Sequence, residues 1–233
     1  MQLIGLGLLV AVVLFGFDDR EMSQVRAFDL HALVIVLGGS AAAILTASRG
    51  RDSLRTLLCL RELLPFAGTL DRGTAALEAA RQRFAELWRD GRRAQAVELA
   101  EQSPLPAVRA MLRLVLARAN ADSADTVFME LRHAELTRWQ PATSNWELLA
   151  RLGPSFGMVG TVTGMIQLFQ SMGADDLDIG AAISLALVAT LYGIAFGAGV
   201  AGPIGHYLRS LLDARLGALS RCRQTAVELA GGG

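Results

Sequence analysis

Two threonines in the C-terminal half of the sequence are the side chains best placed to do chemistry. Thr161 lies in residues 152–172, which contain four glycines and no charged residue, and Thr190 lies in the apolar run 179–208. A hydroxyl group both donates and accepts hydrogen bonds, so two facing hydroxyls could line a path for an ion. Neither run contains Asp, Glu, Lys or Arg. A proton path through these segments would therefore need a carboxylate from another chain.

Each threonine is the centre of a stripe of small residues at helical spacing. Such stripes let membrane helices approach closely, so helix packing alone, with each threonine bonded to its own helix backbone, is an alternative explanation. Leu168 ends the first stripe, and Ala182 and Ala201 bound the second. We expect Thr161 and Thr190 to line the path, and the residues that pack the helices to be Gly157, Gly160, Gly164, Ala186, Gly193 and Gly197.

Pro154 and Pro203 lie near corresponding ends of the two runs. Proline removes a helix hydrogen bond, so each is a candidate kink, with a passive bend as the alternative to a functional hinge. The sequence has no phosphate-binding loop, no nucleophile beside a histidine and no paired carboxylates at catalytic spacing. We therefore expect no enzyme activity, no cofactor and no metal site.

The elements that must position these residues are predicted membrane helices. Hydrophobic residues make up 52% of the chain and the mean hydropathy is +0.39, while 15 of the 22 basic residues lie in residues 48–147. Four apolar runs qualify as spans: 3–17, 30–47, 152–172 and 179–208. The first is short, and a signal peptide is the competing interpretation; its lack of a basic start and of a clear cleavage site favours an uncleaved anchor.

The sequence thus predicts an all-α, polytopic membrane protein with four transmembrane helices and a helical cytoplasmic domain. Arginines follow the second and fourth runs, which places residues 48–147 and the C-terminus in the cytoplasm. The predicted organisation is two spans with a short periplasmic loop in 1–47, a cytoplasmic domain in 48–147, a channel core of two spans in 148–212, and a short cytoplasmic tail in 213–233.

The predicted cytoplasmic domain has apolar residues at helical spacing along most of its length. Apolar residues recur at helical spacing from Leu77 to Trp88, and the face they form contains Leu77, Ala80, Phe84, Leu87 and Trp88. Gly91 is expected to end this helix, and further helices are predicted at 94–101, 107–121 and 126–139. The zero net charge gives no reason to expect a nucleic-acid partner. Cys59 and Cys222 are far apart in the sequence and are expected to be reduced thiols.

Three segments resemble a known family. GPSFGMVGTVTGMIQLF and ISLALVATLYGIAFGAGVAGPIGHYL resemble the two core spans of the MotA/TolQ/ExbB proton-channel family. LHALVIVLGGSAAAIL resembles the second span of its MotA branch, that of the flagellar stator. The cytoplasmic segment does not reproduce the charged torque-generating helix of that branch, so no residue is assigned as a rotor contact.

The resemblance implies a homopentamer in the bacterial inner membrane, in contact with membrane lipid. This pentamer would surround two copies of a single-span partner of the MotB, ExbD or TolR kind, which supplies the proton-accepting Asp. By motif position, Thr161 and Thr190 match pore-facing threonines of the family. Pro154 and Pro203 match prolines assigned to conformational coupling, and proton flow would then drive rotation of the pentamer.

Three functions stay open on the sequence. The first is a MotA-like stator subunit that converts proton-motive force into motility, for which a rotor protein is a further candidate partner. The second is an energiser of the ExbB or TolQ type, which would serve outer-membrane transport or envelope integrity. The third is a membrane scaffold that conducts no ions and uses its glycine stripes only for packing.

Overall fold

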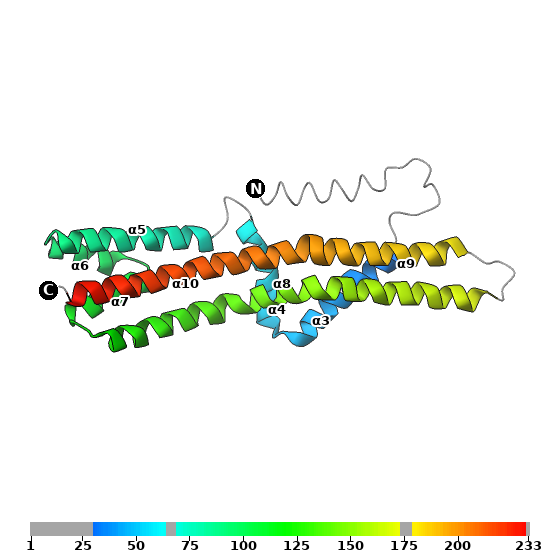
Figure 1. Ribbon diagram of the computed structural model, residues 1–233, viewed down its shortest axis with the longest axis horizontal. Coiled ribbons are helices and arrows are strands. Elements are labelled where there is room, and N and C mark those ends of the chain that lie inside the picture. Colours follow the sequence, from blue (N-terminus) through cyan, green and yellow to red (C-terminus); the bar gives the residue numbers. More distant parts are fainter. Residues whose placement is uncertain (1–29, 64–68, 173–178, 232–233) are drawn as a thin grey trace, which may run out of the picture. The chain divides into compact units, whose positions relative to one another are not determined.

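The computed structural model describes residues 30–63, 69–172 and 179–231, and all regular structure in these ranges is helical (Figure 1). The all-α fold class is therefore confirmed for this part of the chain. The elements are α2 (Leu30–Leu33), η1 (Val34–Gly38), α3 (Gly39–Ala47), α4 (Gly50–Leu58), η2 (Cys59–Leu63), α5 (Leu70–Arg89), α6 (Arg93–Gln102), α7 (Pro106–Leu116), α8 (Ala121–Ser171), α9 (Ile179–Ile194), η3 (Ala195–Ala201) and α10 (Gly202–Gly231).

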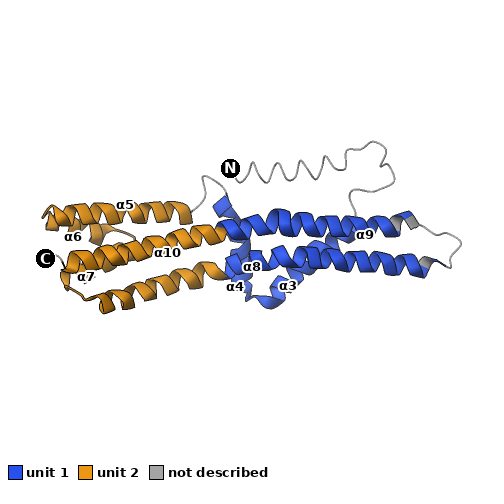
Figure 2. Ribbon diagram, in the orientation of Figure 1, with its two compact units in different colours: residues 1–63, 141–207 blue, residues 64–140, 208–233 orange. Residues whose placement is uncertain are grey.

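The chain forms two compact units, which Figure 2 shows in different colours. Unit 1 consists of Met1–Leu63 and Pro141–Tyr207, and unit 2 consists of Leu64–Gln140 and Leu208–Gly233. Two long helices contribute to both units, since α8 crosses the first boundary at Pro141 and α10 crosses the second at Leu208. Each unit has its own cluster of buried apolar residues.

In unit 1, the helical stretch that begins with α2 packs against α9. Its buried residues Ala32 and Val36 cluster with Leu185, Val188 and Ala189 of α9. This stretch includes η1, a π-helical segment that no pattern in the sequence predicted. Other large apolar side chains of the stretch point away from the cluster and are exposed: Leu30, Val34, Leu37 and Leu45. An apolar outer face of this kind suits a lipid environment.

By length and composition, two helical stretches of the described chain could cross a membrane. One is Leu30–Ala47, and the other is Ala182–Gly231, which contains most of α9 and all of η3 and α10. They correspond to the second and fourth predicted spans. The third predicted span, apart from its last residue Met172, lies within α8, and it is less apolar because glycine, threonine and glutamine interrupt it. The first lies outside the described residues, so four membrane crossings stay a prediction.

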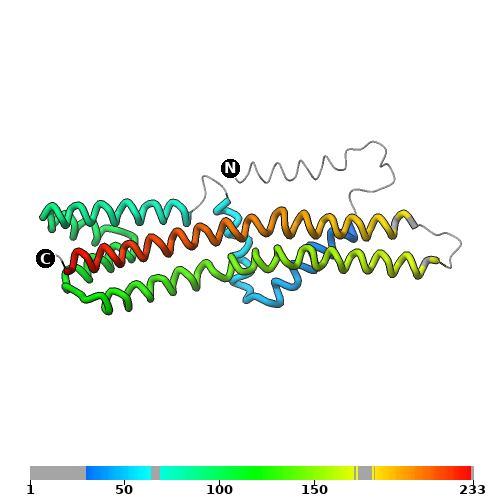
Figure 3. The backbone as a smooth tube through the Cα atoms, in the orientation of Figure 1, coloured from blue at the N-terminus to red at the C-terminus, as the bar shows by residue number. Residues whose placement is uncertain are grey.

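Figure 3 traces the backbone of these helices, and the side chains of unit 2 form an aliphatic and aromatic core of the kind found in water-soluble helical domains. Its largest fully buried side chains include Leu77 and Phe84 of α5, Val108 and Met111 of α7, and Cys222 of α10. The predicted face of α5 is confirmed: Leu87 is buried with Leu77 and Phe84, and Ala80 and Trp88 pack against this core.

The predicted helix ends in unit 2 are partly right. Gly91 follows α5 with φ of 75°, a left-handed conformation that glycine adopts without strain. The helix predicted at 107–121 is too long at its C-terminal end, because α7 ends at Leu116. Asn120 then begins a new helix by accepting a hydrogen bond from the Ser123 N–H at 3.0 Å, as an N-cap residue does. The piece predicted at 126–139 is part of α8, which continues to Ser171.

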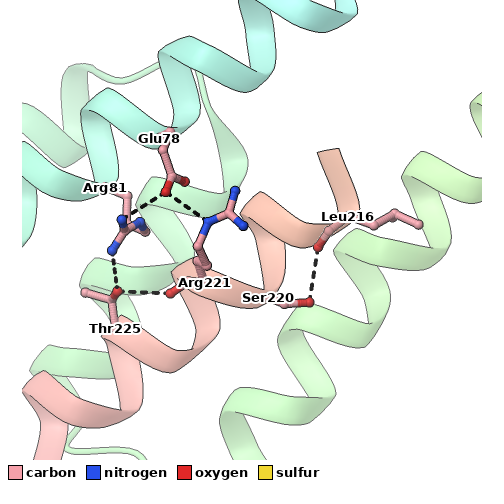
Figure 4. A network of polar contacts seen from close by, with 6 residues as sticks. All are labelled: Glu78, Arg81, Leu216, Ser220, Arg221 and Thr225. Carbon is pink, nitrogen blue, oxygen red and sulfur yellow. Dashed lines mark hydrogen bonds and ion pairs between the residues drawn. The ribbon is translucent and has the colours of Figure 1, made fainter. Parts of the chain in front are cut away.

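Charged residues link α5 to α10 at the edge of the unit 2 core (Figure 4). Oε1 of Glu78 accepts hydrogen bonds from Arg81 and Arg221, each at 2.9 Å. Arg81 also donates to the Thr225 hydroxyl at 3.0 Å. Partial burial would raise the pKa of Glu78, but the hydrogen bonds and charges of the two arginines outweigh it and hold the pKa below its ordinary value.

Both cysteines are free and buried, one in each unit. Burial raises the pKa of Cys59 to about 11 and the pKa of Cys222 to about 12. The charged thiolate is the reactive form of cysteine, so both side chains are inert neutral thiols near pH 7. They serve as packing residues here.

Candidate functional site

The hydroxyls of Thr161 and Thr190 meet between α8 and α9 in unit 1, with their Oγ1 atoms 2.5 Å apart. The Thr161 hydroxyl also lies 3.2 Å from the Gly157 carbonyl, and the Thr190 hydroxyl lies 3.2 Å from the Ala186 carbonyl. Each hydroxyl has one proton, so one threonine donates to the other, and the second donates to a carbonyl. The structure thus joins the two threonines that the sequence singled out.

Glycines bring the two helices close enough for this contact. A Cβ atom added to Gly193 of α9 would lie 2.5 Å from the Gly153 carbonyl oxygen and 2.9 Å from the Gly157 Cα of α8. A Cβ at Gly197 would lie 2.8 Å from the Ala150 carbonyl oxygen. These neighbours are backbone atoms, which cannot turn aside as a side chain can. The α8–α9 approach therefore requires glycine at these positions.

The other predicted packing residues extend the same contact. A Cβ at Gly164 would lie 2.8 Å from the Ala182 carbonyl oxygen and 3.0 Å from the Ala186 Cβ. Gly160 faces Ala189 of α9, with Ile35 of η1 nearby. Gly160 thus lies where three helical segments meet, whereas Gly164 lies in the α8–α9 contact itself.

The pair can bind and orient a polar species but cannot hold a charge. Threonine hydroxyls do not ionise near neutral pH, and the apolar runs around them contain no Asp, Glu, Lys or Arg. His31 and His206 lie near the ends of their runs and are exposed. Among the described residues, no group of three His, Cys, Asp or Glu side chains could hold a metal ion. The arrangement resembles the wall of a path more than a complete relay.

Both prolines lie next to the π-helical segment η3. Pro154 of α8 packs against Gly197 within η3. Pro203 follows η3 directly as the second residue of α10, and its side chain is exposed. At the end of η3, the Gly202 N–H bonds to the Gly197 carbonyl, five residues back. π-helical segments are rare and are frequent at functional sites. The sequence pointed to both prolines but not to the π-helical segment that adjoins them.

Sequence reasoning missed a buried polar cluster in unit 1, formed by Ser48, Thr56, Asn145 and Trp146. The Asn145 amide donates to the Thr56 hydroxyl at 2.8 Å, and the Ser48 hydroxyl donates to the Asn145 carbonyl oxygen at 2.7 Å. The Trp146 indole N–H donates to the Thr56 carbonyl at 3.0 Å. The cluster fixes the break between α3 and α4 to α8. Its one sequence signal is the Asn–Trp pair just before an apolar run.

Residues 100–220 match the family model of the MotA/TolQ/ExbB proton channel family. The chain is similar to motility protein A of Aquifex aeolicus, with 26% identity over 218 residues that cover 89% of this chain and 82% of that protein. It is also similar to motility protein A of Borreliella burgdorferi, with 24% identity over 197 residues, or 82% of this chain and 72% of that protein.

Two solved structures share the fold. The structure of C. jejuni MotAB matches with a TM-score of 0.77 and 18% identity, covering 99% of this chain and 89% of that chain. The flagellar MotAB stator complex from Bacillus subtilis matches with a TM-score of 0.77 and 22% identity, with the same coverage. At these identities the likeness establishes the fold and leaves the activity to be argued from the site.

Proposed function

Because this chain belongs to the MotA/TolQ/ExbB proton channel family, we propose that it is the channel-wall subunit of a proton-driven, MotA-like stator in the inner membrane. The observation that carries this proposal is the Thr161–Thr190 pair, which faces into a glycine-packed contact between two apolar helices. Two hydroxyls in such a place can solvate and hand on a proton, although they cannot keep one. In this proposal the work done by proton flow is motility.

The apolar runs of this chain lack a carboxylate, and this indicates which side chain a partner must supply. A proton carrier in hydrocarbon needs an ionisable group, and the apolar runs of this chain have no acid. We infer that a single-span partner of the MotB kind supplies an Asp opposite the two threonines, and that the chain surrounds that partner as a homopentamer. The MotAB complexes with the same fold support a partner of this kind.

Charge placement supports the orientation. Arg49, Arg51 and Arg55 follow the stretch Leu30–Ala47, and Arg209 and Arg215 follow the fourth apolar run. The positive-inside rule then puts residues 48–147 and the C-terminus in the cytoplasm. Pro154, which packs against η3, and Pro203, which follows it, are the proposed points at which a change at the threonines alters helix geometry.

Motility is favoured over outer-membrane transport by the relatives, since both are motility protein A. A deletion strain separates the two uses. We expect loss of motility with intact iron-siderophore uptake and detergent resistance. The opposite result would assign the chain to an energiser of the ExbB or TolQ type.

The test of the path is proton flux in proteoliposomes that contain this chain and its single-span partner. We expect Thr161→Val and Thr190→Val to reduce flux strongly, because valine keeps the shape and removes the hydroxyl, while Thr190→Ser retains flux. Thr163→Val is the matched control, since among the described residues its hydroxyl bonds only to the Val159 carbonyl of its own helix, at 2.9 Å. Flux unchanged in both valine variants would place the path elsewhere. No flux in the wild-type complex would favour a scaffold.

A further inference from the structure

The helix α4 (Gly50–Leu58) in unit 1 directly follows the apolar stretch Leu30–Ala47 but does not continue it. Ser48 and Arg49, the two residues between α3 and α4, have extended backbones with ψ of 150° and 143°. The chain therefore turns at these residues, and in Figure 1 α4 runs crosswise to the long helix α8. A helix that crosses the direction of the spans lies along a membrane surface and not through it.

One side of α4 is fixed to α8 just before the apolar run 152–172. Thr56 is buried, and its hydroxyl accepts a hydrogen bond from the Asn145 amide at 2.8 Å. The Trp146 indole N–H donates to the Thr56 carbonyl at 3.0 Å. The helix α4 therefore lies where the second predicted span, Leu30–Ala47, has just ended and the third is about to begin.

The side of α4 away from Thr56 is apolar and exposed. Leu54, Leu57 and Leu58 share this side at i, i+3 and i+4 spacing, and they are 59%, 63% and 51% exposed. Outside the four predicted spans, six large apolar side chains of the described chain are exposed, and four of them lie within residues 54–60. This concentration singles out α4 as a surface that something apolar covers. We call Leu54, Leu57 and Leu58 the leucine face.

Arginines border the leucine face. Residues 49–61 contain one acid and four arginines: Arg49, Arg51, Arg55 and Arg61. The acid, Asp52, pairs with Arg55 at 3.6 Å, and Arg51 lies one helical turn before Leu54. The segment therefore combines an apolar face with an excess of positive charge. This combination is typical of a helix that lies at the surface of a membrane with anionic lipids.

Two observations favour lipid over a protein as the occupant of this surface. The stretch that precedes α4 already has an apolar outer face that suits lipid, since its Leu37 and Leu45 are exposed. A bilayer surface also presents phosphate groups next to acyl chains, which matches arginines that border leucines. We propose that α4 binds anionic phospholipid on the cytoplasmic side, with the leucine face against acyl chains and Arg49 and Arg51 against headgroup phosphates.

The test is quenching of tryptophan fluorescence by brominated phospholipids, on the full chain in nanodiscs with any partner that co-purifies. Leu57→Trp places a tryptophan on the leucine face, and the chain without this substitution gives the background of its three native tryptophans. We expect anionic phosphatidylglycerol to quench the added tryptophan at about threefold lower mole fraction than zwitterionic phosphatidylcholine. No quenching by either lipid would mean that water or protein, including a second copy of this chain, covers the leucine face, and would overturn the proposal.

The arginines are tested by Arg49→Gln with Arg51→Gln in the Leu57→Trp chain. This pair should remove the preference for the anionic lipid and leave quenching by phosphatidylcholine intact. Arg83→Gln with Arg109→Gln is the matched control, because both are exposed arginines of unit 2, and it should keep the preference. A preference that survived the first pair would overturn the proposal. Both leaflets of a nanodisc have the same composition, so a change of membrane orientation does not affect the result.

Met129→Trp is the control for position, because Met129 is an exposed apolar residue of unit 2, and it should show little quenching. Quenching as strong as at Leu57 would contradict the proposal.

Inorganic phosphate separates a lipid headgroup from a free anion. Phosphate and chloride at equal ionic strength should lower the lipid preference equally, and loss with phosphate alone would assign the arginines to a free phosphate and overturn the proposal. Leu54→Trp repeats the test if Leu57→Trp lowers the melting temperature. The proposal needs the stretch Leu30–Ala47 to span the bilayer but does not need proton conduction. Proton flux is not measured, so failure of the proposed channel would leave the result unchanged.

Discussion

Units 1 and 2 are both helical, but opposite kinds of residue hold their helices together. In unit 1, α8 and α9 meet through Gly153, Gly157 and Gly193, and backbone touches backbone. In unit 2, α5, α7 and α10 meet through large side chains such as Phe84 and Met111. In a lipid bilayer, burying apolar side chains between helices gives no hydrophobic gain, so membrane helices are held together by close backbone contact. In water, the hydrophobic effect drives large apolar side chains into the core. The two units thus have the packing expected for two different solvents.

The polar groups differ in the same way. Unit 1 buries neutral groups that bond to one another or to backbone, as in the Thr161–Thr190 pair and the cluster around Asn145. Its buried carboxylate, Glu62, lies in η2, outside the predicted spans. Unit 2 uses charges at the edge of its core, as in the contacts of Glu78 with Arg81 and Arg221. Charges are tolerable where water reaches them and costly in hydrocarbon. Unit 1 should therefore be sensitive to added atoms, and unit 2 to removed atoms or charges.

The largest effect is expected from removing a core side chain of unit 2. Phe84 is fully buried and stacks on Trp88, with ring centroids 5.8 Å apart. Phe84→Ala should cost about 3–5 kcal/mol of unit 2 stability, because it loses apolar burial and leaves a cavity. Hydrogen exchange by mass spectrometry on the full chain in nanodiscs should show faster exchange in α5, α6 and α7 than in α9. Phe84→Leu should cost less. Equal acceleration in α9 would contradict a separate core.

Added atoms in unit 1 should produce the next largest effect. The new Cβ in Gly193→Ala would meet the Gly153 carbonyl oxygen at 2.5 Å, so α8 and α9 must separate. We expect a loss of about 1–3 kcal/mol, with faster hydrogen exchange in α9 and reduced proton flux as the Thr161–Thr190 contact opens. The measurement is unfolding of the detergent-solubilised protein together with flux in proteoliposomes.

Gly73→Ala is the control for Gly193→Ala, because it makes the same substitution at a helical glycine of unit 2. Gly73 is a helical glycine of α5 in unit 2, and a Cβ there would meet nothing within 4 Å. The same substitution should leave stability unchanged or raise it by up to about 1 kcal/mol, since alanine is the better helix former. If the two alanine variants behaved alike, close backbone contact would not be what holds unit 1 together.

Residue patterns within one helix were readable from the sequence, and contacts between distant segments were not. Helical spacing identified the buried face of α5 and the small stripes that meet around Thr161 and Thr190. The Asn145 cluster joins residues 89 and 97 positions apart, which no local pattern encodes. The π-helical segments η1 and η3 are equally hidden, because a bond from residue i to i+5 leaves no distinct spacing in an apolar run. Whether Thr161 and Thr190 conduct protons stays a prediction.

The smallest expected effect is the loss of one charge in unit 2, and its pH dependence distinguishes it from a packing effect. Glu78→Gln removes the carboxylate that accepts from Arg81 and Arg221, each at 2.9 Å. The expected cost is about 1 kcal/mol at neutral pH. Glu98→Gln on α6 is the matched control, because Glu98 is exposed and, within the described part of the chain, accepts only from Gln102 of its own helix. It should change stability by a few tenths of a kcal/mol at most.

The sign of the pH dependence follows from the pKa of Glu78, which the arginines hold below its ordinary value of 4.5. Well above pH 4.5 the carboxylate is ionised in both the folded and unfolded chains, and its full contribution is present. As the pH falls through the lowered folded pKa, the carboxylate is protonated and that contribution is lost. The stability difference between wild type and Glu78→Gln, measured by hydrogen exchange or chemical unfolding, should therefore be constant from neutral pH to about 5 and shrink towards pH 3. A difference that persisted at low pH would mean that Glu78 stabilises unit 2 through packing and not through its charge. The charged edge of unit 2 would then differ from the neutral pairs of unit 1 in residue type but not in how it contributes to the free energy of unfolding.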